Sequence, residues 1–184
     1  RGILDEILDP GSSVLGYPVI GGDEAIPDEV RRGCRFLVTI GQTSSPGPRK
    51  RAFDTVRAAG GRLVALISAS ARVSASAIVG SGTIVMQGST VNAKARIGEN
   101  TIINNHSLVE HGTIIGSHCH VATGAIVNGD CVLGDGVMLG SGAVVIQGIR
   151  VASGAVIGAA AVVIRDIQQD GTYAGNPARL IHSR

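Results

Sequence analysis

The sequence predicts a short α/β unit followed by a parallel β-helix of hexapeptide repeats. The main observation is the repeat itself: from Ala71 onward an aliphatic residue recurs at every sixth position, from Val73 to Val163, without an insertion. The composition agrees, because a chain with 27 glycines, 2% aromatic residues and no tryptophan must build its core from aliphatic and small side chains. The first 68 residues lack the repeat, which marks them as a separate unit.

The N-terminal unit, residues 1–68, alternates short apolar runs with helical segments. We expect strands at residues 3–5, 34–40 and 62–67, and helices at residues 27–32 and 49–59. Strands that alternate with helices are typical of a parallel α/β sheet.

Polar residues follow the first two predicted strands. Asp5 and Glu6 end the first strand, and Gly41 and Gln42 follow the second. Because parallel sheets bind ligands at the carboxyl ends of their strands, both pairs are expected at a ligand-binding edge. The unit contains no G-x-G-x-x-G, so the sequence does not indicate a dinucleotide site.

The second unit, residues 69–184, reads as a β-helix because a six-residue period is typical of that fold. If three hexads form one triangular coil, residues 18 apart stack in columns about 4.8 Å apart. Asn92, Glu110 and Asn128 then form a polar column, which we interpret as structural. After Asp166 the repeat breaks, and we expect this tail to cap the stack.

Charge and composition exclude several classes of protein. The 16 Lys and Arg residues nearly balance the 14 Asp and Glu residues, so neither a nucleic acid nor an anionic membrane is an expected partner. No apolar run approaches the ~18 residues of a membrane span. The three cysteines form no C-x-x-C, which argues against a disulfide framework or a zinc site and favours a reducing cytoplasm. Small-molecule partners are expected.

Three motifs resemble those of the NeuD/PglD-type sugar acyltransferases. They are the segments NNHSLVEH at 104–111 and GSHCHV at 116–121, and the ending GNPAR at 175–179. The resemblance implies a left-handed β-helix, a homotrimer with active sites between subunits, acetyl-CoA as acyl donor, and a Rossmann-like unit that binds a nucleotide sugar. Family members open with a further strand and a glycine-rich loop. This sequence lacks that opening, so we interpret it as part of a longer protein rather than as a change in nucleotide recognition.

The resemblance also assigns a general base. His111 matches the catalytic histidine of the family, and imidazole, with a pKa near ~6.5, suits proton removal near neutral pH. Many members follow this histidine with Asp or Glu, but here the next residue is Gly112. Glu110 or a backbone carbonyl are the alternatives that we expect to orient the ring.

Further site residues are implied by the same alignment. Asp5 and Glu6 would bind the nucleobase, Asn104 the acceptor sugar, and His120 would lie near the thioester, where it or a backbone amide would stabilise the oxyanion. Small corner residues would line the CoA track: Ala122, Gly129, Gly140, Ser141, Gly158 and Ala159. Cys119 and Cys131 are expected to be inert structural thiols, and no metal is expected.

The preferred function is therefore acetylation of the amine of a nucleotide-activated amino sugar by direct attack on the thioester. A sialic acid or sugar O-acetyltransferase is the nearest alternative. A metal-dependent hydratase is suggested by the spacing of His106 and His111, but Ser70 stands where the third ligand is wanted. A non-catalytic trimeric scaffold is suggested by Gly112 and by the missing opening.

Overall fold

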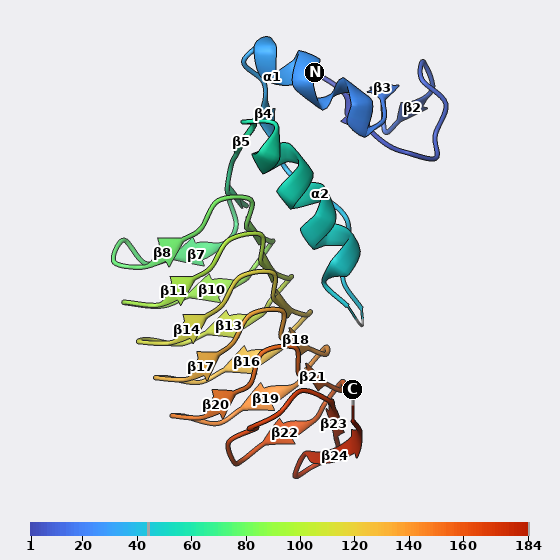
Figure 1. The fold of residues 1–184 in the computed structure, drawn as a ribbon. Helices are drawn as coiled ribbons and strands as arrows, with labels where there is room; N and C mark the ends of the chain where they lie inside the picture. Colours follow the sequence, from blue (N-terminus) through green and yellow to red (C-terminus); the bar gives the residue numbers. More distant parts are fainter. Residues whose placement is uncertain (44, 184) are drawn as a thin grey trace.

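The computed structural model describes residues 1–43 and 45–183. A parallel β-helix forms most of the molecule, the N-terminal unit lies at its first coils, and the C-terminal strands close its other end (Figure 1). Three sheets make up the three faces of the β-helix, and their strands pair in parallel except for the last strand of the third sheet. The fold fits the left-handed hexapeptide class that the resemblance implies.

Each face is a ladder of two-residue strands. The first face contains β7 (Arg72–Val73), β10 (Thr90–Val91), β13 (Leu108–Val109), β16 (Ile126–Val127), β19 (Val144–Val145) and β22 (Val162–Val163). The second contains β8 (Ile78–Val79), β11 (Arg96–Ile97), β14 (Ile114–Ile115), β17 (Val132–Leu133) and β20 (Arg150–Val151). The third contains β6 (Leu66–Ile67), β9 (Ile84–Val85), β12 (Ile102–Ile103), β15 (His120–Val121), β18 (Met138–Leu139), β21 (Val156–Ile157), β23 (Thr172–Ala174) and β24 (Arg179–His182).

The predicted stacking period is confirmed. Leu108 pairs with Thr90 on one side and with Ile126 on the other, so the register between neighbouring coils is 18 residues. The repeated aliphatic residues from Val85 to Val163 are buried and form one continuous core. The inward position of each hexad therefore supplies the burial that a single coil lacks.

The first coil begins earlier than the boundary expected at residue 69. β6 pairs with β9 in the third face, so residues 66–67 already belong to the β-helix. The predicted strand 62–67 is therefore two strands, because β5 (Arg62–Leu63) pairs with β4 (Arg35–Phe36) instead. Only residues 35–36 of the expected strand 34–40 are paired.

Within the described residues, 1–43 and 45–68, the N-terminal unit contains two small sheets. β1 (Ile3–Leu4) pairs parallel with β3 (Tyr17–Gly21), which forms an antiparallel hairpin with β2 (Ser13–Val14) that the sequence analysis missed. β4 and β5 form the second sheet, so the described strands do not make the single parallel sheet that was expected. The helices are close to prediction: α1 spans Ile26–Arg31, after a 3₁₀ turn η1 (Asp23–Ala25), and α2 spans Gly47–Ala58.

Helix α2 docks the N-terminal unit on the β-helix (Figure 1). Phe53 is 1% exposed, and a Cβ on Gly82 would lie 2.7 Å from its ring. The guanidinium of Arg49 is fully buried and donates to the backbone oxygens of Asn100 and Gly82 in the β-helix and of Val38 and Ile40 in the preceding loop. This contact fixes the loop before α2 against the third face.

The tail after Asp166 caps the stack, as predicted. β23 pairs with β21 and continues the third face, and β24 then returns antiparallel to β23. Tyr173 is 9% exposed and belongs to the core cluster, so its ring covers the end of the aliphatic column.

Candidate active site

The predicted residues gather at two corners of the coil. The first corner lies between the third and first faces and contains Asn104; the second lies between the first and second faces and contains His111. β13 separates these two residues within one coil. Within one chain, His111, the expected base, and Asn104, the residue expected to bind the sugar, therefore do not come together.

The expected CoA track is largely one column of the first corner. Following the 18-residue register from Asn104, this column contains Ala122, Gly140 and Gly158, with Ser141 and Ala159 beside it. A Cβ on Gly140 would lie 2.5 Å from the backbone nitrogen of Ala159, so coil packing by itself requires glycine here. Gly129 lies at the second corner instead, beneath His111.

His120 links the first corner to the N-terminal unit. Its Nδ1 donates to the backbone oxygen of Gln42 at 2.6 Å, and its Nε2 accepts from Nδ2 of Asn104 at 3.0 Å. The amide orientation of Asn104 is set because its Oδ1 accepts from the backbone nitrogen of Asn105 at 2.7 Å. Burial lowers the pKa of His120, since the residue is only 9% exposed.

These contacts bear on the role expected for His120. A neutral ring whose Nδ1 proton is bound to Gln42 and whose Nε2 is an acceptor has no free proton for an oxyanion. The backbone amide alternative is the one that agrees with this geometry. Within the chain, His120 instead accepts a hydrogen bond from Asn104.

His111 lies at the second corner with its ring exposed. The imidazole lies over Gly129, where a Cβ would approach Cε1 to 2.7 Å, and its Nδ1 is 4.0 Å from Oδ1 of Asp130. No hydrogen bond to either ring nitrogen is found within residues 1–43 and 45–183. The ring of His111 therefore lies against Gly129 of the next coil, and more than half of the side chain is exposed.

Glu110 is engaged in the predicted polar column rather than with the ring of His111. Its Oε2 accepts from Nδ2 of Asn92 at 2.8 Å and from the backbone nitrogen of His111 at 3.3 Å. Nδ2 of Asn128 donates to the backbone oxygen of Val145. The structural interpretation of this column agrees with these bonds, and Glu110 is not the group beside the imidazole.

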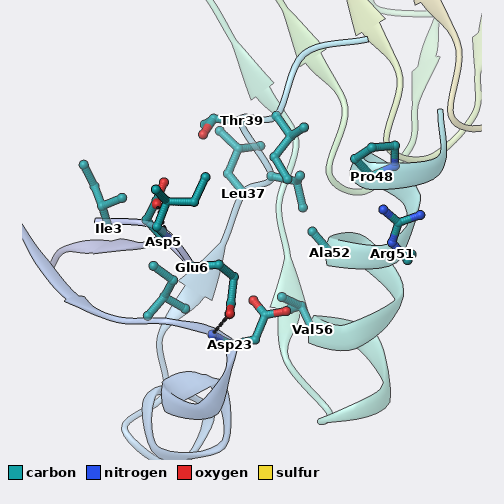
Figure 2. A pocket seen from close by; sticks show the side chains of 14 residues that line it. Ile3, Asp5, Glu6, Asp23, Leu37, Thr39, Pro48, Arg51, Ala52 and Val56 are labelled. Atoms are coloured by element: carbon teal, nitrogen blue, oxygen red, sulfur yellow. Dashed lines mark hydrogen bonds between the residues drawn. The ribbon is translucent and has the colours of Figure 1, made fainter. Parts of the chain in front are cut away.

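A second candidate region is a pocket in the N-terminal unit (Figure 2). Asp5, Glu6 and Asp23 lie on one side of it, and Arg51 of α2 lies on the other. Oδ1 of Asp5 accepts from the backbone nitrogens of Ile7 and Leu8, which lower its pKa. Burial, and then the neighbouring carboxylates of Glu6 and Glu24, raises the pKa of Asp23. The pocket thus presents ionisable carboxylates opposite a cation.

Gly41 and Gln42 do not line this pocket, although the sequence analysis expected them beside Asp5 and Glu6. The pocket is bordered by residues 37–40 of the same segment. Gln42 is 3% exposed and lies against the β-helix, where its Nε2 donates to the oxygen of Gly136. The strand that precedes it is short, so the chain has already turned toward the third face.

Three residues of these regions were missed. Asp23 and Arg51 reach the pocket from η1 and α2, and Asp130 reaches His111 from the next coil. The 18-residue register places position 130 beside position 112, one residue from His111. That register was the available signal for Asp130, whereas nothing in the sequence pattern marked the other two.

The cysteines of the β-helix lie in its core, which agrees with the structural role expected for them. Cys119 and Cys131 are both fully buried. Burial raises the pKa of Cys119 to about 12 and also raises that of Cys131. Thiolates are therefore disfavoured at both positions.

His106 and His111 lie at successive corners and do not converge within one chain. Among residues 1–43 and 45–183, no three His, Cys, Asp or Glu side chains are grouped to hold a metal ion. Within the same residues, no helix has the length and apolar character needed to cross a membrane.

Comparison with known proteins identifies the family. The model of the bacterial transferase hexapeptide (six repeats) matches residues 94–129. The chain is similar to perosamine N-acetyltransferase from Caulobacter crescentus in complex with CoA and GDP-perosamine, with 34% identity over 97% of this chain and 83% of that one and a TM-score of 0.90. In that structure and in another of the same enzyme, one histidine is replaced by asparagine or alanine. A search of curated proteins found no match.

A second relative is the acetyltransferase domain of PglB from Neisseria gonorrhoeae FA1090 in complex with acetyl coenzyme A. It is 31% identical over 98% of this chain and 85% of that one, with a TM-score of 0.91. The chain belongs to the hexapeptide-repeat sugar acyltransferase family. The expectations of an acetyltransferase and of CoA as the acyl carrier are confirmed by these relatives.

Proposed function

We propose that this protein transfers an acetyl group from acetyl-CoA to the amine of a nucleotide-linked amino sugar, with His111 as general base. The observation that carries the proposal is the likeness, over 97% of the chain, to an N-acetyltransferase that binds CoA and GDP-perosamine. The expected Rossmann-like N-terminal unit would hold the nucleotide in the pocket of Asp5, Glu6 and Asp23.

The active site is proposed to form between subunits of a homotrimer. The outward residues of the first face carry no charge from the second coil onward: Thr90, Leu108, Ile126, Val144 and Val162. The second face instead carries Arg96 and Arg150. If three first faces meet around an axis, the first corner of one subunit adjoins the second corner of its neighbour. His111 of one copy would then face Asn104 and the CoA track of the next.

The reaction requires one proton to move. The amine nitrogen attacks the thioester carbonyl carbon, His111 accepts the proton from that nitrogen, and the tetrahedral oxyanion is stabilised by backbone amides. The C–S bond then breaks, the CoA thiolate leaves, and the proton of His111 returns to the thiolate. No acyl-enzyme is required, which agrees with the buried state of Cys119 and Cys131.

The test is thiol release from acetyl-CoA with a panel of nucleotide-linked amino sugars beside sialic acid, followed by mass spectrometry of the product. His111→Ala should reduce turnover by roughly 10²–10⁴-fold, the range typical of a lost general base. The matched control is His182→Ala, since His182 is an exposed residue of β24. CoA binding and oligomeric state should be unchanged in both variants.

The outcomes separate the candidate functions. Histidine-dependent release with an amino sugar supports N-acetylation, whereas release with sialic acid alone would make the protein an O-acetyltransferase. A fully active His111→Ala variant would refute the assigned base. A protein that binds CoA but releases no thiol with any acceptor would be a scaffold.

A further inference from the structure

The residue after the proposed base is Gly112, so the carboxylate that would orient the ring must come from elsewhere. We propose that Asp130, on the next coil, positions His111 by accepting a hydrogen bond from its Nδ1–H. This inference rests on the proposed function for its catalytic consequence, but the contact itself does not depend on the substrate.

The first observation is the approach of the two side chains. Oδ1 of Asp130 is 4.0 Å from Nδ1 of His111, and the side chains are 59% and 58% exposed. The backbone nitrogen of Asp130 donates to the oxygen of His111 at 2.9 Å, so the two residues are tied together at the backbone. A hydrogen bond requires the two atoms to approach further, and both side chains are exposed enough to change rotamer.

The second observation concerns two glycines that make this approach possible. A Cβ on Gly112 would lie 2.2 Å from Oδ1 of Asp130, so the carboxylate occupies the space that a side chain at 112 would take. A Cβ on Gly129 would lie within 2.7–3.3 Å of the imidazole of His111. Because neither position 112 nor position 129 has a side chain, the ring of His111 and the carboxylate of Asp130 can lie side by side.

The neighbouring carboxylate of this corner, that of Glu110, is engaged elsewhere. The carboxylate of Glu110 is bound to Asn92 and to the backbone nitrogen of His111. Asp130 is therefore the carboxylate beside Nδ1 of His111. It lies one coil further on in the same column as position 112, where many family members have Asp or Glu.

The chemical consequence is a defined tautomer. With the Nδ1 proton directed at Asp130, the lone pair of the ring lies on Nε2, which is the nitrogen left to accept the proton of the amine. The carboxylate also stabilises the imidazolium that results. Burial of the corner by a neighbouring subunit would strengthen both effects, because the effective dielectric constant falls.

The test compares Asp130→Asn with a variant that returns the carboxylate from the other position, Gly112→Asp/Asp130→Gly. The left-handed backbone at both sites, φ +67° and +58°, is one that Asp and Gly tolerate. Asp130→Asn should lower kcat by about tenfold or more, a part of the roughly 10²–10⁴-fold effect of a general base, with KM for acetyl-CoA unchanged. The double variant should recover most of the loss. Asp170→Asn, an exposed residue of the C-terminal tail, controls for the charge.

A second readout does not require activity. Long-range ¹H–¹⁵N correlation spectra of the full chain should show His111 as the Nδ1–H tautomer, and Asp130→Asn should reduce that population. Unchanged spectra and unchanged kcat in Asp130→Asn would overturn the proposal. If the wild type releases no thiol with any acceptor, the proposed function fails while the spectra still decide whether Asp130 and His111 are paired.

Discussion

Nδ1 of His120 donates to the backbone oxygen of Gln42 at 2.6 Å, across 78 residues of sequence. This bond joins the loop before α2 to the third face of the β-helix and, through Nε2, to Asn104 at the first corner. Asn104, which is proposed to bind the substrate, is therefore linked through His120 to the N-terminal unit. Any change in the docking of the N-terminal unit is expected to reach the first corner along this path.

The His120 bond predicts a loss of stability in acid. Burial lowers the pKa of His120, and of His118, below the ~6.5 of an unfolded histidine. The unfolded chain then binds more protons than the native one, so the free energy of unfolding falls as the pH drops below about 6.5. A protonated His120 would also direct a second donor at Asn104. Urea unfolding between pH 7.5 and 5 should show this slope, and His120→Gln should reduce it; an equal slope in that variant would exclude His120 as the source.

The Arg49 contact predicts a large stability effect from a single substitution. Arg49→Met would leave four backbone oxygens without this donor, and three of these hydrogen bonds are buried. We expect the free energy of unfolding to fall by about 2–4 kcal/mol and the first unit to become sensitive to proteolysis. Arg62→Met, at an exposed position of β5, is the comparison. Equal melting curves for the two variants would contradict the docking role of Arg49.

The uncharged first face predicts which substitution disrupts assembly. Ile126→Glu on that face should convert the proposed trimer to monomers at micromolar concentration, because an unpaired carboxylate would be buried at the interface. Ile114→Glu is the matched change on the second face, at a residue that is 44% exposed. Its trimer should persist. Light scattering after size exclusion measures both, and dissociation of Ile114→Glu alone would move the interface to the second face.

Two glycine substitutions separate stability from positioning. Gly112 and Gly148 have φ of +67° and +76°, so alanine should cost about 1–2 kcal/mol of stability at each. Only a Cβ at 112 meets Asp130, since nothing lies within 4 Å of the one at 148. Gly112→Ala should therefore reduce kcat, whereas Gly148→Ala should leave it unchanged. Chemical denaturation should show a similar fall in the free energy of unfolding for both variants. Equal turnover in the two would argue that displacing Asp130 has no effect.

The six-residue period determined most of the β-helix by itself. Each hexad fixes which side chain faces inward, and strands paired at 18 residues leave one register in which those side chains, such as Val91, Val109 and Val127, stack in a buried column. The burial of Cys119 and Cys131 follows from their place in the hexad, and the cap follows from the point where the repeat breaks. The N-terminal unit was less predictable, because two-residue strands such as β4 and β5 are too short to show a periodicity.

The tertiary structure alone decided the surroundings of the candidate site. Arg49, Gln42 and Arg51 owe their positions to the way α2 and the loop before it pack, and such long-range contacts cannot be read from the local sequence. Asp130 is intermediate: the period places it beside position 112, but only the structure shows that two missing Cβ atoms bring its carboxylate to His111. The repeat specifies where backbones stack, whereas side-chain packing between coils and between units decides which groups meet.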